Sequence, residues 1–231
     1  MSAGHIVILT GAGVSAESGL PTFRGPDGLW EGHRVEDVAT PEAFDRDPHL
    51  VHRFYNLRRR ALDSVGPNAA HLAIARLQRE RRVTLVTQNI DDLHERAGST
   101  GVIHMHGELR KALCTRCGAR MEWIDDMEVD TPCPACGKTG GMRPDIVWFG
   151  EMPYRMEEIE SALMDADLFA AIGTSGNVYP AAGFVRTARF AGARTIEFNN
   201  AGTAVSGFFE DHRLGPATVE VKRWVDNLLD A

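Results

Sequence analysis

The chain has 231 residues, of which 43% are hydrophobic and 25% charged, and its formal net charge is −7. This acidic balance argues against a binding surface for nucleic acid or for an anionic membrane, and no apolar run is long enough to cross a bilayer. The first residues run straight into a strand without a basic and apolar leader. We therefore expect no nucleic-acid partner, no membrane association and a cytoplasmic location.

The first predicted element is a buried strand over 6–9, which ends in a glycine-rich turn. Gly11 and Gly13 allow the backbone to approach an anion closely, and Ala16 stands where dinucleotide-binding turns carry Gly or Ala. The free N–H groups of the following helix would face a pyrophosphate. The pattern favours a phosphate site, and the alternative is a tight turn that binds nothing.

Residues 20–34 are rich in glycine and proline around Phe23 and Trp30. This composition disfavours regular structure, while the aromatic residues indicate that the segment packs on something when it closes. We interpret it as a lid, with a loop that merely covers a core as the alternative.

Two helices are predicted next, over 49–65 and 69–81, and Asn68 is a good N-cap for the second. On the first helix Tyr55 and Arg58 are three residues apart, so they project side by side. A hydroxyl beside a guanidinium can hold a carboxylate by charge-assisted hydrogen bonds. The alternative is that Arg58 belongs to a solvated basic face.

A second buried strand is predicted over 83–86, followed by the polar residues Gln88, Asn89 and Asp91 and a helix over 93–97. Side chains at the carboxyl end of a strand in an open α/β sheet point into the crevice where ligands bind. The roughly 70 residues between the first two strands exceed a simple crossover, so we infer an inserted helical module.

A short strand over 101–107 carries two histidines, His104 and His106, which alternation would place on one face. A lone histidine is more often a satisfied core group than a catalyst, so this pattern alone identifies no base.

Four cysteines form two C-x-x-C pairs separated by fifteen residues, Cys114 with Cys117 and Cys133 with Cys136. This spacing is typical of a tetrahedral zinc site, with an iron centre or a redox dithiol as alternatives. Because four protein ligands leave no open position, we expect a structural Zn²⁺ that folds the module 109–142 and takes no part in catalysis.

The rest of the chain returns to the main domain. Residues 147–150 are interpreted as a buried strand, or as an edge that accepts a peptide strand. The later predicted elements are a helix over 157–164, strands over 168–172, 195–198 and 216–221, and a helix over 222–229. Strands that alternate with helices predict a doubly wound, Rossmann-like α/β fold, in which the carboxyl ends of four strands build one cleft suited to a dinucleotide.

Taken together, these motifs resemble the sirtuin family of NAD-dependent protein deacylases. The matching segments are Gly11-Ala12-Gly13, Ser15, Ser18-Gly19, Pro21, Phe23-Arg24, Thr87-Gln88-Asn89-Ile90-Asp91, His106-Gly107, the four cysteines, Arg143-Pro144, Ile146-Val147, Phe149-Gly150-Glu151 and Gly173-Thr174-Ser175. They run in family order over nearly the whole chain. The departures, Leu20 and Thr22, do not touch the chemistry.

The resemblance implies that NAD is a co-substrate and that His106 is the catalytic base, which takes a proton from a ribose hydroxyl. The implied NAD-binding residues are Gly11, Ala12, Gly13, Ser15, Ser18, Thr22, Phe23, Arg24, Trp30, Gln88, Asn89, Ile90, Asp91, Gly173, Thr174, Ser175, Asn199 and Ala217. The implied substrate-binding residues are Ala39, Tyr55, Arg58, Val147, Trp148, Phe149, Gly150 and Glu151. The products would be free lysine, nicotinamide and O-acyl-ADP-ribose.

Ala39, Tyr55 and Arg58 are similar to the residues of those sirtuins that also remove succinyl and malonyl groups, so we expect acylated-lysine proteins as partners. The expected organisation is a monomer with an NAD-binding domain (1–34, 82–108 and 143–231), a helical insertion (35–81) and a zinc module (109–142). The rival hypotheses are a mono-ADP-ribosyltransferase or NAD glycohydrolase, and a noncatalytic NAD-sensing module.

Overall fold

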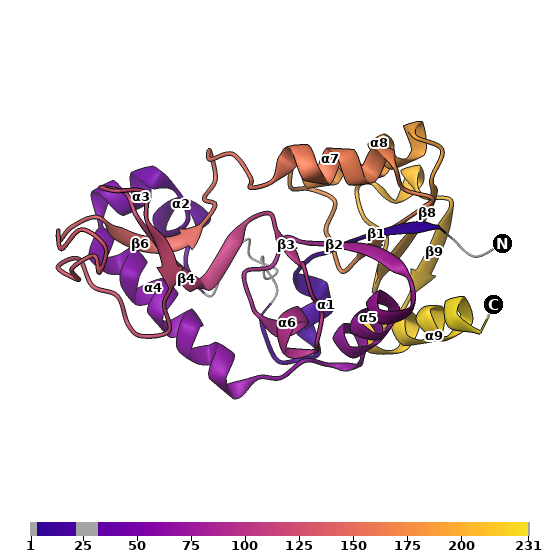
Figure 1. Ribbon diagram of the computed structural model, residues 1–231, viewed down its shortest axis with the longest axis horizontal. Coiled ribbons are helices and arrows are strands. Elements are labelled where there is room, and N and C mark those ends of the chain that lie inside the picture. The colour runs from indigo at the N-terminus through magenta and orange to yellow at the C-terminus, as the bar shows by residue number, and fades with distance from the viewer. Residues whose placement is uncertain (1–3, 22–31, 231) are drawn as a thin grey trace.

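The structure, a computed structural model, describes residues 4–21 and 32–230 and contains a larger parallel sheet and a smaller antiparallel one (Figure 1). The larger sheet has the order β3-β2-β1-β7-β8-β9, and all neighbouring strands are parallel. Its strands are β1 (His5–Thr10), β2 (Arg82–Thr87), β3 (Ile103–His104), β7 (Leu168–Ile172), β8 (Arg194–Asn199) and β9 (Asp211–Leu214). The strand order reverses between β1 and β7, which confirms the predicted doubly wound class.

Helices cover both faces of this sheet. The covering helices are α5 (Ala69–Glu80) and α9 (Ala217–Leu229) on one face, and α7 (Met156–Met164) and α8 (Phe184–Phe190) on the other. Ile6 and Ile8 of β1 pack with the first pair, and Val7 and Leu9 with the second. Because both faces are buried, β1 reads as a continuous apolar run. The carboxyl ends of the strands point toward the smaller sheet (Figure 1).

The smaller sheet has β4 in the middle of the order β5-β4-β6, with both pairs antiparallel. Its strands are β4 (Gly107–Cys114), β5 (Arg120–Glu122) and β6 (Met142–Ile146). Beside it lie α2 (Val35–Val38), α3 (Pro41–Arg46), α4 (Pro48–Ala61) and the 3₁₀ turn η1 (Leu62–Ser64). The other short elements are α1 (Ala12–Ala16), α6 (Leu93–Arg96), η2 (Ala181–Gly183) and η3 (Ser206–Phe208).

Two buried polar residues of α4 join this helix to the cysteine-bearing segment. The Asn56 side chain exchanges two hydrogen bonds with the backbone of Met127, at 2.9 and 3.0 Å. Arg59 donates to the carbonyls of Leu109 at 2.9 Å and Asp125 at 3.2 Å. Burial lowers the pKa of Arg59 to about 10. These bonds hold the inserted helices and the smaller sheet together as one support for the site.

The predicted strand over 216–221 is wrong, because these residues begin α9. Their alternating pattern imitates a strand, but Val221 and Val225 lie one helical turn apart and are both buried against the sheet. The last strand is instead β9 at the sheet edge, in which three of the four residues are polar and Leu214 is 65% exposed. Its sequence therefore lacks the apolar run that would predict a buried strand.

Two other predicted strands also differ. β3 covers only Ile103 and His104, and His106 lies in the turn before β4, so the alternation argument does not apply to the histidine pair. Residues 147–150 form no strand, because the β ladder ends at Ile146. The helix over 49–65 and the strand over 168–172 are confirmed as α4 with η1 and as β7.

Residues 142–146, as β6, pair in the smaller sheet. The expected three-part division of the chain stays a prediction. None of the described helices is long and apolar enough to cross a membrane.

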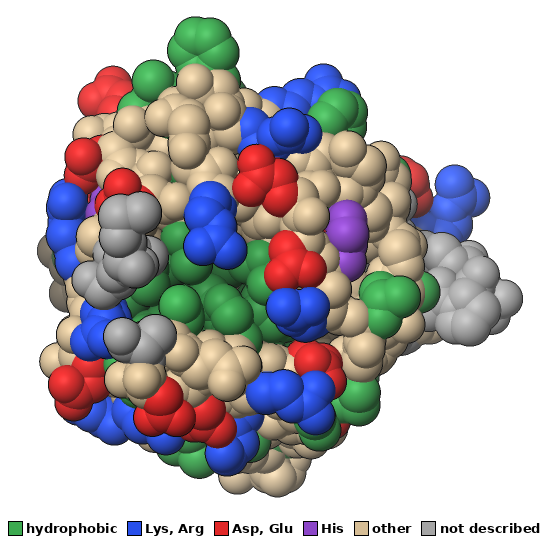
Figure 2. Space-filling view, turned by 90° about the vertical axis from the view of Figure 1, so that its right-hand side faces the viewer, with side chains coloured by type: hydrophobic (Ala, Val, Ile, Leu, Met, Phe, Trp, Pro, Cys, Tyr) green, Lys and Arg blue, Asp and Glu red, His purple; other side chains and the backbone are tan. Residues whose placement is uncertain are grey.

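Figure 2 shows the end of the molecule opposite the smaller sheet, where hydrophobic side chains gather in a hollow ringed by charged ones.

Three buried histidines predict a stability that falls in mild acid. Burial lowers the pKa of His52 and of His71 to about 4, and that of His94 well below its usual value. Between pH 6.5 and 4 the unfolded chain therefore binds protons that the folded chain does not, so the free energy of unfolding decreases as the pH falls. His104, whose pKa is raised, opposes this trend.

The measurement is thermal unfolding between pH 7.5 and 5. Each histidine with such a depressed pKa is expected to contribute on the order of 1 to 2 kcal/mol of lost stability over this range. His52→Leu should flatten the dependence, and His49→Leu, on the exposed side of the same helix, is the matched control. A dependence equally steep in His52→Leu and the parent would contradict the prediction.

Candidate active site and zinc site

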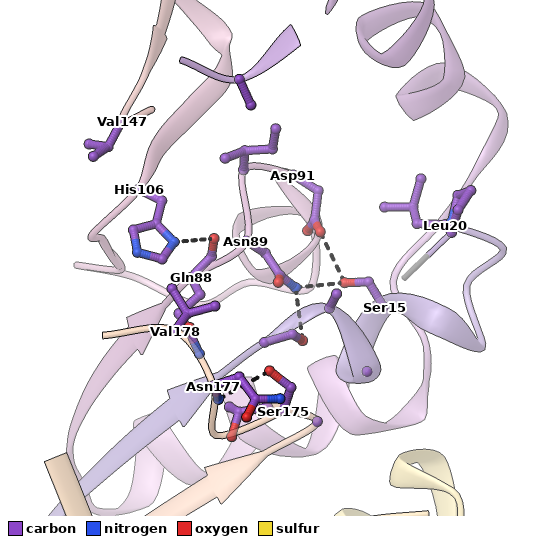
Figure 3. Close-up of a pocket in the computed structure, with 18 of the residues that line it drawn as sticks. Ser15, Leu20, Gln88, Asn89, Asp91, His106, Val147, Ser175, Asn177 and Val178 are labelled. Atoms are coloured by element: carbon purple, nitrogen blue, oxygen red, sulfur yellow. Dashed lines mark hydrogen bonds between the residues drawn. The ribbon is translucent and has the colours of Figure 1, made fainter. Parts of the chain in front are cut away.

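A cavity of about 710 Å³ lies where the carboxyl ends of the larger sheet meet α4 and the segment after β6. Figure 3 shows its polar floor, with side chains from the turns after β1, β2 and β7 pointing into one space. Cavities of this size accommodate a small organic ligand or a cofactor. Its walls come from both parts of the fold, so neither part forms the site alone.

The turns after β1 and β7 meet by direct backbone contact. The Gly11 N–H donates to the Ile172 carbonyl at 3.0 Å, and the Gly13 N–H to the Gly173 carbonyl at 2.9 Å. A Cβ on Gly13 would lie 2.6 Å from the Gly173 Cα, and Gly173 has a φ of +63°. Only glycine fits at both positions, which leaves an open surface of backbone at the sheet edge.

Three polar side chains form a buried cluster beside these turns (Figure 3). The Ser15 hydroxyl donates to Asp91 Oδ2 at 3.0 Å and accepts from Asn89 Nδ2 at 3.1 Å. Asn89 Nδ2 also donates to the Gly11 carbonyl at 3.2 Å. Burial raises the pKa of Asp91, while the hydrogen bonds from the Leu93 N–H and the Ser15 hydroxyl oppose that rise. The cluster presents hydrogen-bonding groups that suit an amide ligand.

His106 lines the cavity opposite this cluster, and its orientation identifies its tautomer. Nδ1 lies 3.1 Å from the Gln88 carbonyl, which can only accept a hydrogen bond, so Nδ1 carries the proton. Nε2 is then the basic nitrogen. Burial lowers the pKa of His106, so the ring is neutral at neutral pH. A neutral imidazole with a fixed tautomer is a suitable general base.

His104 has a different environment and a different protonation state. Its Nε2 lies 2.8 Å from Glu95 Oε1 and its Nδ1 lies 3.2 Å from the Asn89 carbonyl, so both nitrogens donate. Burial alone would lower the pKa of His104, but the hydrogen bond and charge of Glu95 raise it above its usual value. His104 therefore acts as a buried cation that holds the backbone of Asn89.

The far end of the cavity is formed by α4 and the smaller sheet. Tyr55 and Arg58 line it together with Ala39. Tyr55 is 1% exposed, and its hydroxyl accepts a hydrogen bond from Trp148 Nε1 at 3.0 Å. Arg58 is half-buried, with its guanidinium carbon 5.6 Å from the centre of the Phe54 ring. The predicted hydroxyl and guanidinium thus lie in one pocket.

The segment 147–151 ends in a turn, in which the Glu151 N–H donates to the Trp148 carbonyl at 3.0 Å, and an ion pair with Arg143 holds that turn. Arg143 donates to both carboxylate oxygens of Glu151, at 2.7 and 3.0 Å, and Glu151 accepts the Trp148 N–H at 2.7 Å. The Val147 N–H donates to the His106 carbonyl at 2.9 Å. This loop therefore connects the end of the cavity beside α4 with His106.

The four cysteine sulfurs lie within 4.8 Å of one another. Cys114 and Cys136 have their Sγ atoms 4.0 Å apart, and Cys117 and Cys133 have theirs 3.8 Å apart. A tetrahedron with Zn–S bonds of about 2.3 Å has sulfurs about 3.8 Å apart, so the four thiolates fit zinc. A glycine with positive φ follows each C-x-x-C pair and closes its turn.

A protein-family model described as the Sir2 family matches residues 11–180. The chain belongs to the Sir2 family. It is 58% identical over 230 residues to a protein of Bdellovibrio bacteriovorus named NAD-dependent protein deacylase, covering 98% of this chain and 97% of that protein. The resemblance inferred from the motifs is thereby confirmed.

Solved structures of Sir2 proteins share the fold of this Sir2-family chain. A Sir2 homologue in complex with NAD has a TM-score of 0.91 and 39% sequence identity, covering 99% of this chain and 90% of that one. A Sir2 protein bound to a myristoylated histone peptide has a TM-score of 0.77 and 31% identity, covering 99% and 92%.

Most of the predicted site residues of this Sir2-family chain line the cavity described above. They are Gly11, Ala12, Gly13, Ser15, Ala39, Tyr55, Arg58, Gln88, Asn89, Ile90, Asp91, His106, Val147, Trp148, Phe149, Gly150, Glu151, Gly173, Thr174, Ser175 and Asn199. Ser18 and Ala217 do not line it; Ser18 instead accepts a hydrogen bond from Asn68. The predicted lid residues Thr22, Phe23, Arg24 and Trp30 lie outside the described residues. The individual roles stay predictions.

Two loops that the sequence motifs did not predict also line the cavity, 177–179 after β7 and 200–204 after β8. Both follow strands that were predicted, so their position at the carboxyl edge was a usable signal. Glu197 at the end of β8 was also missed. Its buried carboxylate accepts hydrogen bonds from Thr203 at 2.6 Å and Ser206 at 2.5 Å, which shapes the second loop.

We expect one zinc ion per chain, and its removal should unfold the cysteine module. Metal content by mass spectrometry should fall from one equivalent to none in Cys133→Ser, with a lower thermal unfolding temperature. Thr131→Ser, a half-buried neighbour in the same segment whose hydroxyl accepts from the Glu128 N–H, is the control. Iron or two disulfides in the purified protein would contradict the zinc assignment.

Proposed function

We propose that this chain is an NAD-dependent protein-lysine deacylase that removes acetyl groups and, through Tyr55 and Arg58, succinyl and malonyl groups. The observation that carries the proposal is the neutral, Nδ1-protonated His106 in a cavity that joins a glycine-lined sheet edge to a pocket with a hydroxyl and a guanidinium. The name of the Bdellovibrio relative supports the same activity.

NAD fits the glycine-lined end of the cavity. The backbone contact between Gly13 and Gly173 leaves room for a pyrophosphate, and the turn after β8 offers polar groups to a ribose. Within the described residues Asn89 Oδ1 accepts no hydrogen bond, so it is available to a carboxamide N–H beside Asp91. When bound, NAD supplies the glycosidic bond that is cleaved and the ribose that accepts the acyl group.

The acyl-lysine substrate would lie along the loop 147–151. This loop lines the cavity, and its first residue, Val147, donates a backbone hydrogen bond to the His106 carbonyl. A lysine side chain that enters there would place its acyl group between His106 and the pocket of α4. His106 Nε2 would then take the proton of a ribose hydroxyl. A Sir2 protein of known structure binds a myristoylated histone peptide, which supports an acylated peptide as the substrate.

The acyl specificity follows from the charge of the far pocket. An acetyl group would end in the cavity without a polar partner, whereas a succinyl or malonyl group carries a carboxylate. The Arg58 guanidinium and the Tyr55 hydroxyl can both donate to that carboxylate, and Ala39 leaves space because its side chain is small. The pocket therefore favours dicarboxylic acyl groups.

We also infer that the protein acts in the cytoplasm, as a monomer and without a nucleic-acid partner. A net charge of −7 supports the absence of nucleic acid. Four thiolates that bind metal suit a reducing compartment. The monomeric state is tested by sedimentation of the purified protein.

His106→Ala should strongly slow acyl transfer, because His106 is the histidine among the described residues that line the cavity. The expected loss of kcat is on the order of 10²-fold or more. The measurement is nicotinamide release with acetyl-lysine and succinyl-lysine peptides, together with mass spectrometry of the products. His212→Ala, a half-exposed histidine on β9 that does not line the cavity, is the control.

The products separate the rival hypotheses. O-acyl-ADP-ribose identifies a deacylase, whereas peptide-bound or free ADP-ribose without acyl transfer identifies a ribosyltransferase or a glycohydrolase. NAD binding that is unchanged in His106→Ala, with no nicotinamide release from the parent protein, would identify a noncatalytic module.

Replacing Tyr55 with Phe and Arg58 with Met should lower desuccinylation more than deacetylation. Each change removes a donor to the acyl carboxylate, and the ratio of kcat/KM for succinyl over acetyl peptide should fall by about tenfold or more. Arg53→Met, an exposed arginine of the same helix, is the matched control. Equal losses of both activities would mean that the pair does not select the acyl group.

A further inference from the structure

The Tyr55 hydroxyl has a buried hydrogen-bond donor beside it that the proposed specificity does not use. The indole N–H of Trp148 donates to the Tyr55 oxygen at 3.0 Å. Tyr55 is 1% exposed and Trp148 is 2% exposed, so both groups are shielded from water. A hydrogen bond in such surroundings is directional, and breaking it leaves a buried donor unsatisfied.

This bond determines which way the phenol proton points. An indole nitrogen can only donate, so the Tyr55 oxygen is the acceptor and its own proton is directed away from Trp148. Burial raises the pKa of Tyr55, which keeps the phenol protonated. Tyr55 and Trp148 both line the cavity. The indole therefore engages the Tyr55 oxygen as an acceptor, so the phenol proton is directed at some group other than Trp148.

Trp148 is itself held on two sides. The Arg143 guanidinium carbon lies 3.4 Å from the centre of the indole ring, and the Trp148 backbone N–H donates to Glu151 at 2.7 Å. Arg143 and Glu151 are joined by the two hydrogen bonds of their ion pair. The ring position is thus set from the smaller sheet and not by Tyr55 alone.

We propose that Trp148 is a positioning residue for acyl selection, which orients the Tyr55 hydroxyl to donate to the carboxylate of a succinyl or malonyl group. The inference rests on the proposed function, because it assigns a role within the same pocket. It differs from a packing role in one respect. Packing uses the whole indole ring, whereas orientation of Tyr55 uses only the N–H.

The test is a double-mutant cycle of Trp148→Phe and Tyr55→Phe, with kcat and KM measured for succinyl-lysine and acetyl-lysine peptides. Trp148→Phe should lower the succinyl-to-acetyl ratio of kcat/KM by about fivefold, mainly through a higher KM for the succinyl peptide. In the Tyr55→Phe background the same change should have no further effect on the ratio, because no hydroxyl remains to be oriented.

Two further variants separate orientation from folding. Benzothienylalanine at position 148 keeps the bicyclic shape without the N–H, and it should reproduce the loss of ratio even if Trp148→Phe unfolds. Trp224→Phe is the matched control, because Trp224 packs on Phe198 under the sheet and does not line the cavity.

The outcomes distinguish this inference from the proposed function. If Tyr55→Phe lowers the ratio but the benzothienylalanine protein keeps it, or if the two losses multiply in the double mutant, the positioning role of Trp148 is overturned and the acyl pocket stands. If Tyr55→Phe and Arg58→Met both leave the ratio unchanged, the proposed acyl specificity fails and the inference fails with it.

Discussion

The backbone contact between Gly13 and Gly173 is the constraint on which the site depends. It joins the turns of two neighbouring parallel strands at the point where the strand order reverses. Any side chain at either position would enter the other turn, since a Cβ on Gly173 would lie 2.4 Å from the Val14 nitrogen. The contact exposes backbone at the sheet edge and places Ser15 beside Asn89 and Asp91. The glycine-lined end of the cavity, where we propose that NAD binds, is therefore a consequence of sheet topology.

The other end of the cavity, where we propose that the acyl group binds, depends on a second support that is independent of the larger sheet. Asn56 and Arg59 tie α4 to the cysteine-bearing segment, and the Arg143–Glu151 pair holds the loop that follows β6. A zinc ion bound by the four cysteines would stabilise this support from the outside. It lies in a separate cluster from the cavity, which explains how a closed metal site can matter to a reaction without touching it.

Different buried partners also give His104 and His106 different protonation states, although the two histidines are close in the chain. His104 donates from both nitrogens and is favoured as a cation, whereas His106 donates from one and stays neutral. The difference comes from the carboxylate of Glu95, which reaches only the first ring. The same principle applies to Tyr55, whose oxygen has a donor, Trp148, on one side. Partners, and not residue types, decide which groups can accept or donate a proton.

Several features were determined by the sequence alone. The apolar run before Gly11, the polar residues after 83–86 and the spacing of the four cysteines identified the fold class, the cleft and the zinc site, because each is a local pattern with one physical reason. Local patterns gave wrong predictions where tertiary packing determined the secondary structure. Residues 217–221 alternate like a strand but join α9, and the polar β9 forms only because an edge of the sheet is available to it. The tautomer of His106, the orientation of Tyr55 by Trp148 and the loops 177–179 and 200–204 could come only from the tertiary structure. Each depends on a contact between segments far apart in the chain, and no spacing within one segment encodes it.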